Sequence, residues 1–276
     1  MTNAVRVVVA VILMSSAVSA QWPAYPTPGI PKNSDGTPNL NAPAPRAADG
    51  KPDLSGLWEP GVFAGAQAEP VAGAPGGSLF GDVSRGVAGG LPLQPWAAEV
   101  VRKRKADNSK DNPDALCLPM GIMQNNTHPY PRKIVQGNAH VIVILYEIQG
   151  AVRQIFMDGR SLPNNDPQPF WSGYSVGRWE GDTLVVESSG FRDDGWLDTV
   201  GNPLTGAGKM TERFRRPNFG TLETEVTVDD PKTYTKPFTV KFKYRLMLDT
   251  ELIEHVCLDR SSQHYVGASG ASGGAK

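Results

Sequence analysis

The chain has 276 residues and a formal net charge of −1, with 39% hydrophobic and 20% charged residues. This balance is ordinary for a folded globular protein, and it offers neither the basic surface of a nucleic-acid-binding protein nor a polybasic membrane anchor. Glycine (30) and proline (24) are both abundant, which favours short strands joined by many turns.

The N-terminus is typical of a secretory signal peptide. Arg6 precedes an unbroken apolar run from Val7 to Met14, and Val18-Ser19-Ala20 supplies small residues for cleavage. The run is too short to span a bilayer, and no later segment reaches the ~18–20 apolar residues of a transmembrane helix. We predict a signal peptide at 1–20 and a secreted mature chain without a transmembrane segment, most simply in a bacterial periplasm. An uncleaved anchor and a cytosolic chain with an unusual start are the alternatives.

The first part of the mature chain is irregular. Residues 21–54 form a proline-rich lead that predicts successive turns, and a first strand is expected at Leu54–Trp58. A glycine- and alanine-rich loop at 61–94 follows, with too little side-chain area to form a core. Pro95–Ala106 predicts one short helix, since proline stands at its start and basic residues at its end.

From Ile134 onward the pattern predicts strands. Apolar and polar residues alternate in segments separated by turn residues, as half-buried strands require. The predicted hairpins cover 140–157, 174–189, 210–228 and 238–258. We therefore predict a mostly β protein with a single β-domain at 55–260, folded as an antiparallel barrel or a strongly curved meander sheet, and a disordered tail at 261–276.

The last predicted hairpin supplies the main candidate for chemistry. A two-residue turn at Asp249-Thr250 would set His255 opposite Tyr244, with both side chains on the apolar inner face. A neutral histidine beside a tyrosine could move protons, with His255 as general base and Tyr244 as proton donor or oxyanion partner. Alternatively, His255 is a core residue bonded to a backbone carbonyl.

Two carboxylates could complete such a site. Glu147 lies among valines near the end of a predicted strand, where it is either a functional group or simply wetted by solvent. Glu187 is predicted to lie diagonally across a hairpin from Arg178. That ion pair would either decorate the surface or lie at the floor of a polar pocket, with Arg178 anchoring an anionic ligand.

Loop residues near the strand ends form a second group of candidates. Asp158 and Arg160 project an acid and a base from a turn, and ligand pockets of barrels open where such loops gather. Trp171, Tyr174 and Trp196 could form an aromatic rim for a sugar or an apolar ligand, or else act as core plugs.

Cys117 and Cys257 are the two cysteines of the chain. In an oxidising compartment they are expected to form a disulfide, and two buried thiols are the alternative. No histidine or cysteine cluster has metal-ligand spacing, and no phosphate loop or dinucleotide fingerprint appears, so we predict neither a metal nor a cofactor.

Two resemblances add to this interpretation. Gly56-Leu57-Trp58 is similar to the glycine-x-tryptophan of the first lipocalin strand, a family in which an arginine packs across the tryptophan, and Arg260 could match it. This resemblance implies a lipocalin- or calycin-like barrel. The segments 49–56, 177–187 and 229–237 resemble a family of secreted bacterial proteins of unknown function, which implies no catalytic residues.

Two classes of function fit these observations. The first is a periplasmic pocket protein that binds a small apolar or cyclic molecule, either as a binder alone or with cofactor-free lyase, isomerase or hydrolase chemistry. The second is a non-catalytic carrier or cell-envelope interaction module whose loops do the binding. The sequence names neither the ligand nor the oligomeric state.

Overall fold

The computed structural model of the protein describes residues 25–60, 81–137, 140–163 and 168–257. The predicted signal peptide at 1–20, residues 61–80 of the predicted loop and the predicted tail at 261–276 lie outside these residues.

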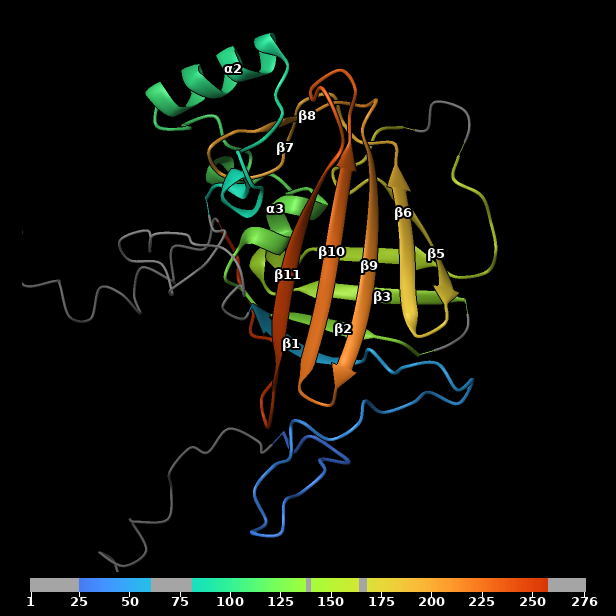
Figure 1. Ribbon diagram of the computed structural model, residues 1–276. Helices are drawn as coiled ribbons and strands as arrows, with labels where there is room; N and C mark the ends of the chain where they lie inside the picture. Colours follow the sequence, from blue (N-terminus) through green and yellow to red (C-terminus); the bar gives the residue numbers. More distant parts are fainter. Residues whose placement is uncertain (1–24, 61–80, 138–139, 164–167, 258–276) are drawn as a thin grey trace, which may run out of the picture.

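Nine strands close into a barrel, which confirms the mostly β fold (Figure 1). Around the ring their order is β1-β11-β10-β9-β6-β5-β4-β3-β2. Strands β9 to β11 run upright in Figure 1 while β2 and β3 run across, so the two halves of the barrel cross steeply. The barrel strands are β1 (Gly56–Pro60), β2 (Arg132–Val135), β3 (Val141–Tyr146), β4 (Val152–Phe156), β5 (Tyr174–Glu180), β6 (Thr183–Ser189), β9 (Lys209–Asn218), β10 (Thr221–Asp229) and β11 (Phe238–Met247). Two further strands, β7 (Gly195–Trp196) and β8 (Pro203–Leu204), form a separate small sheet.

Alternation of side chains builds the barrel wall. In β11, every second residue from Phe238 to Leu246 is buried, and the residues between them carry basic or hydroxyl side chains to the outside. The hairpins β3–β4, β5–β6 and β9–β10 form where the sequence predicts them. A bulge between Thr221 and Glu223 shifts the register of the β9–β10 hairpin and sets Phe214 opposite Thr224.

The ring has one weak seam. Strands β4 and β5 are parallel and pair over two positions only, Ile155 with Ser175 and Phe156 with Val176. All other neighbours in the ring are antiparallel. β4 ends at Phe156 and β5 begins at Tyr174, a separation that leaves room for the crossover that a parallel pair requires.

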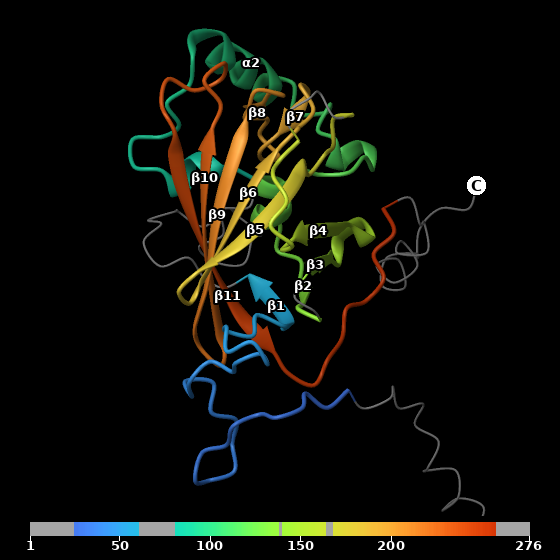
Figure 2. The ribbon, with the colours of Figure 1, turned by 90° about the vertical axis from the view of Figure 1, so that its right-hand side faces the viewer.

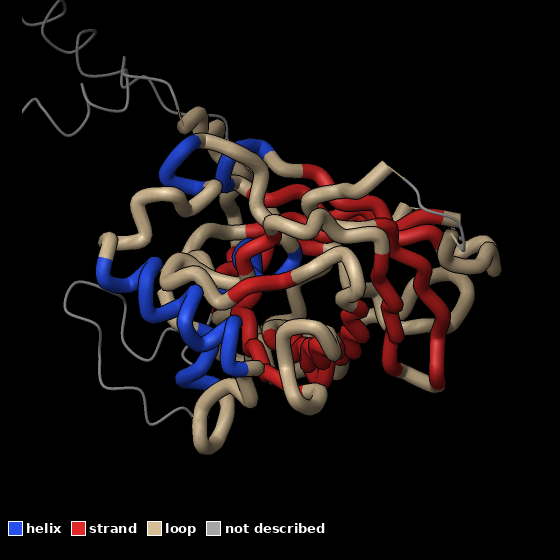
Figure 3. The backbone as a smooth tube through the Cα atoms, turned by 90° about the horizontal axis from the view of Figure 1, so that it is seen from above, coloured by secondary structure: helices blue, strands red, loops and turns tan. Residues whose placement is uncertain are grey.

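The chain has a second helix that the sequence pattern did not predict. The predicted helix is confirmed as α2 (Pro95–Ala106), which lies across one end of the molecule (Figures 1 and 3). The unpredicted one is α3 (Ile122–Thr127), all six of whose residues are buried. Three short 3₁₀ turns complete the helical elements of the described chain: η1 (Val83–Gly86), η2 (Asp114–Leu116) and η3 (Ile148–Gly150).

Trp58 of β1 is fully buried and is covered by an arginine. The Arg216 guanidinium lies 4.9 Å from the centre of its ring and donates to the carbonyl oxygens of Asp53, Ser55 and Phe219. A tryptophan–arginine contact of the kind found in lipocalins therefore exists, but β9 supplies the arginine. The expected partner, Arg260, lies outside the described residues.

The return strand predicted after β11 is wrong. Residues 251–257 have no strand partners and instead pass along the outside of β2 to β4 (Figure 2). The neighbours of β11 are β1 and β10, so Tyr244 pairs with Pro60 and Leu222 and not with His255. Because β1 takes the position beside β11 and closes the ring, no edge is left for a returning strand.

A disulfide explains where the C-terminal segment goes. Cys117 and Cys257 are bonded, as predicted, with their Cα atoms 5.6 Å apart and a sequence separation of 140. The bond ties the segment after β11 to the loop that precedes α3.

Candidate functional site

A recess of about 570 Å³ opens beside the β4–β5 seam. One wall is β4, and the other is the stretch from Phe170 to Ser175 that leads into β5. We call this recess the seam groove. Its lining mixes aromatic, aliphatic and polar side chains, among them Met120, Arg153, Phe156, Trp171, Tyr174 and Ser175.

Phe156 and Tyr174 form one rim of the seam groove, and the neighbouring Asp158–Arg160 pair contacts both of them. The Arg160 guanidinium donates to Asp158 and, at 2.8 Å, to the hydroxyl of Tyr174. It also lies 4.1 Å from the centre of the Phe156 ring, which stacks on Tyr174 with ring centres 5.0 Å apart. Hydrogen bonding to Arg160 lowers the pKa of Asp158 to about 2, so this rim carries a fixed ion pair. The structure thus brings Tyr174 into contact with the turn that carries Asp158 and Arg160.

Trp171 lies farther along the same groove. Its ring is covered by the Arg192 guanidinium, 4.5 Å from the ring centre, and Arg192 is itself paired with Asp194. Gly173 has a φ of +63°, and a Cβ there would meet Phe191 and the Ser189 carbonyl at 2.7 Å. Glycine is therefore required for the chain to turn between the two aromatic residues.

The floor of the groove is a buried ion pair. Arg153 donates to Glu212 (Nη1 to Oε1, 3.0 Å) and to the hydroxyls of Ser175 and Ser188. Burial alone would lower the pKa of Arg153, but the charge of Glu212 outweighs this effect and the pKa is raised. Sequence reasoning missed this cluster. The one available signal was Glu212 itself, a carboxylate that alternation places between the inward-facing Met210 and Phe214.

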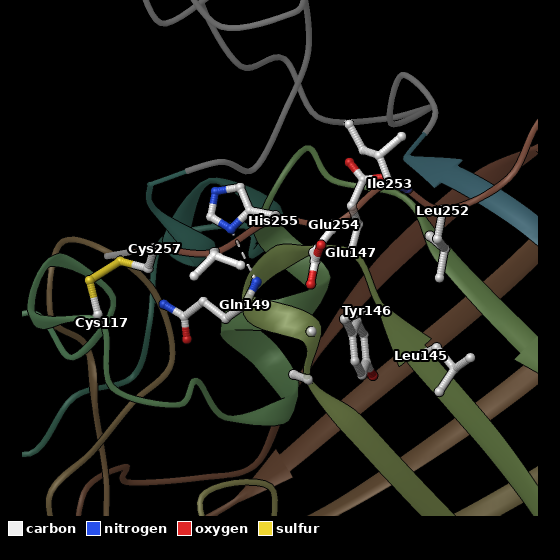
Figure 4. Close-up of a pocket in the computed structure, with 13 residues that line it drawn as sticks. Cys117, Leu145, Tyr146, Glu147, Gln149, Leu252, Ile253, Glu254, His255 and Cys257 are labelled. Carbon is white, nitrogen blue, oxygen red and sulfur yellow. Dashed lines mark hydrogen bonds between the residues drawn. A yellow bond between two sulfur atoms is a disulfide. The ribbon is translucent and has the colours of Figure 1, made fainter. Parts of the chain in front are cut away.

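A second recess, of about 540 Å³, contains two of the predicted catalytic residues, His255 and Glu147 (Figure 4). Both hold the chain in place. The backbone N–H of Gln149 donates to Nδ1 of His255 at 3.2 Å, and Glu147 accepts from the backbone N–H of Ile253 at 3.2 Å. The His255 ring also packs edge-on against Tyr130. These contacts fasten the 251–257 segment to the barrel wall.

The other two predicted catalytic residues lie elsewhere. Tyr244 is inside the barrel and donates to Oδ1 of Asn126 at 2.9 Å, and burial raises its pKa. Glu187 is on the outer surface, where it pairs with Arg178 at 3.0 Å. The inward projection expected for His255 was wrong, because the segment that carries it runs outside the barrel. His255, Tyr244 and Glu187 therefore share no site.

Of the remaining candidates, Arg178 and Trp196 lie away from the seam groove. The Arg178 guanidinium is about half exposed on the outer face and also pairs with Glu180, so it anchors no pocket. Trp196 is buried, and the Arg104 guanidinium lies over it, 4.1 Å from the ring centre. Trp196 is therefore a core residue and does not line the seam groove.

A layer of polar side chains crosses the barrel interior. Each of eight strands contributes one of these side chains, and none of the eight is more than 4% exposed. On adjacent strands, the contributing residues lie directly or diagonally opposite each other. We call this layer the polar belt; it consists of Arg132 (β2), Tyr146 (β3), Arg153 (β4), Ser175 (β5), Ser188 (β6), Glu212 (β9), Thr224 (β10) and Tyr244 (β11). The seam groove reaches the belt at Arg153 and Ser175.

Comparison with known proteins assigns no family. No family model, no curated protein and no solved structure matches the chain. Within the described residues, no group of three or more histidine, cysteine, aspartate or glutamate side chains is arranged to hold a metal ion. The helices in that part of the chain are also too short or too polar to cross a membrane.

Proposed function

We propose that this protein is a secreted, non-catalytic module that binds a small cyclic or aromatic molecule in the seam groove. The observation that carries the proposal is the groove itself, in which aromatic rings form the walls and a fully bonded polar cluster forms the floor. Ligand pockets are commonly apolar clefts with a few fixed polar groups that orient the ligand.

The aromatic residues of the groove favour a flat or cyclic ligand. Phe156 and Tyr174 stack on each other, and Trp171 lines the same groove, so a ring bound there could make stacked or edge-on contacts with these side chains. The polar groups within reach are the Tyr174 hydroxyl, the Gln154 amide and the Ser175 hydroxyl.

The other recesses support binding less well. In the His255 recess, the polar atoms of His255 and Glu147 are occupied in holding the 251–257 segment. A hollow on the outer face of β9 to β11 is lined mainly by charged side chains that include the Lys241–Glu225 pair, and it offers a ligand no aromatic wall.

Non-catalytic binding is favoured over lyase, isomerase or hydrolase chemistry by the separation of the candidate groups. A general base and its proton donor must lie within hydrogen-bond reach of one substrate. Here His255 is outside the barrel and bonded to a backbone N–H, while Tyr244 is inside and bonded to Asn126. Secretion is supported by the apolar run at Val7–Met14 together with the Cys117–Cys257 disulfide, a bond that persists in oxidising compartments.

The test is native mass spectrometry of protein isolated from its own periplasm, combined with binding of the fluorescent aromatic probe 8-anilinonaphthalene-1-sulfonate. We expect the wild type to carry a small molecule, and Trp171→Ala to lose it and to bind the probe at least ~10-fold more weakly. Trp96→Ala is the matched control, since Trp96 is an exposed tryptophan on α2 outside the groove. Equal ligand retention by the two variants, or no binding of either kind by the wild type, would refute the proposal.

A further inference from the structure

Three arginines are buried in the described part of the barrel, and their surroundings differ. Arg153 is paired with Glu212, and Arg216 is bonded to three backbone carbonyls at the β1 end. Arg132 is 3% exposed, yet no carboxylate of the described residues lies within ion-pair distance of it. A buried cation without a counter-charge is unfavourable. Arg216 also has no ion-pair partner, but its guanidinium is bonded to three carbonyl oxygens, whereas the guanidinium of Arg132 is only partly bonded.

The contacts of Arg132 satisfy only part of its guanidinium. Nη1 donates to Oδ1 of Asn126, and Nη2 donates to the backbone oxygen of Asn125 at 2.9 Å. The flat faces of the group lie over Tyr146 and Tyr244, at 5.2 and 4.4 Å from the ring centres. Its Nε–H has no acceptor among the described atoms.

Other polar atoms around Arg132 are also without partners. Nδ2 of Asn126, Oδ1 of Asn125 and the hydroxyl of Thr224 are buried and bonded to no described atom. Asn125 and Asn126 belong to α3, which caps the interior, and Thr224 is the diagonal neighbour of Tyr244 in the polar belt. Buried polar groups are otherwise nearly always bonded. Four unbonded atoms, on Arg132, on the two α3 residues that bond it and on a neighbour of Tyr244, therefore indicate a missing partner.

The chemistry of these groups defines that partner. Nε–H of Arg132 and Nδ2–H of Asn126 are donors, and the Thr224 hydroxyl can donate as well, whereas Asn125 Oδ1 is an acceptor and lies outside this donor set. The Nε–H and one Nη–H of an arginine form a fork that matches a carboxylate with two parallel hydrogen bonds. The belt also carries two arginines against one glutamate, which leaves one positive charge to be balanced.

We propose that Arg132, Asn126 and Thr224 form an interior binding site for a small carboxylate anion, capped by α3 and separate from the seam groove. The carboxylate takes the Nε side of Arg132 and neutralises the belt. The site differs from the proposed ligand site in both position and chemistry, so either can fail without the other.

The experiment is thermal unfolding of the full chain in a series of buffers in which chloride is replaced by formate at constant ionic strength. A second series in sulfonate buffer alone is the reference without either anion. We expect formate to raise the melting temperature of the wild type saturably, by about 5 °C at 100-fold excess over its dissociation constant. Asn126→Asp supplies a carboxylate beside Arg132 and should abolish the formate response. Asn218→Asp, at a partly buried asparagine of β9 whose buried Oδ1 is unbonded, should keep it.

The outcomes are decisive in both directions. No formate response in the wild type, an equal response to chloride, or an unchanged response in Asn126→Asp would overturn the proposal and leave buried water as the partner of these atoms. If Asn126→Asp does not fold, calorimetric titration of formate into the wild type and into Arg132→Gln replaces it. Heat of binding in the wild type alone supports the site, and heat in both or in neither refutes it.

Discussion

The pair formed by Arg153 and Glu212 gives the sharpest test of the barrel interior. Their side chains are 3% and 0% exposed, and the Arg153 guanidinium also holds the hydroxyls of Ser175 and Ser188. The variant Glu212→Gln keeps the shape of the side chain but leaves a buried cation without its counter-charge. Breaking a buried pair in this way costs about 3–5 kcal/mol, a large part of the ~5–15 kcal/mol of a typical domain.

The double variant Arg153→Met/Glu212→Leu separates charge from packing. Replacing both partners by apolar residues is often neutral, or stabilising by about 1–4 kcal/mol. Ser175 and Ser188 would still bond each other, since their oxygens are 2.8 Å apart. We therefore expect the double variant to be more stable than Glu212→Gln alone.

Urea unfolding followed by tryptophan fluorescence measures these free energies. The control is Glu225→Gln, which removes an equivalent carboxylate from the exposed pair with Lys241 and should cost less than about 1 kcal/mol. If Glu212→Gln is no more costly than Glu225→Gln, or if the double variant is the least stable of all, the interior is wetter than the structure indicates and the reasoning fails.

Three further predictions concern covalent linkage, pH and backbone conformation. Replacing both Cys117 and Cys257 by serine should lower the free energy of unfolding measurably, with an upper limit of about 5 kcal/mol. An unchanged urea midpoint would contradict this expectation. Burial raises the pKa of Asp198 to about 6, so its stabilising contribution is complete below ~pH 4 and is lost as the pH rises through 6. Relative to Asp198→Asn, the wild type should lose up to about 3 kcal/mol over that interval, and parallel stability–pH curves would disprove it. Gly173→Ala should cost about 2 kcal/mol and weaken probe binding in the seam groove, whereas Gly181→Ala, in the left-handed β5–β6 turn with free space and outside the groove, should leave binding unchanged.

The strands were predictable because the residues that determine each strand are close together in the sequence. Alternation in 210–228 and 238–247 fixes both the secondary structure and the inner face, and turn residues mark where each hairpin reverses. The segment Glu251–Leu258 follows the turn residues Asp249-Thr250, so the sequence predicted a return strand there. Whether such a segment pairs depends on whether the adjacent edge is free, and in this protein β1 occupies that edge.

Helix α3 and the polar belt could not be predicted for a different reason. The helix has six residues, with asparagines and a threonine at its end, so no propensity or periodicity identifies it. Arg153 and Glu212 are 59 residues apart and meet only because the barrel closes. The grouping of Asp158, Arg160 and Tyr174 was partly predictable, since turns at strand ends gather at barrel mouths, whereas the bond between Arg160 and Tyr174 was not.

The position of the seam groove follows from the number of strands in the barrel. Strand directions can alternate all the way around a closed ring only if the number of strands is even, and this ring has nine. One pair of neighbours must therefore run the same way, and in this chain that pair is β4 and β5. Adding or deleting one strand would remove the need for a parallel pair and, with it, the gap that the groove occupies. The recess in this barrel wall is thus a consequence of the odd strand number, and a homologue with eight or ten strands would have to form its ligand groove elsewhere.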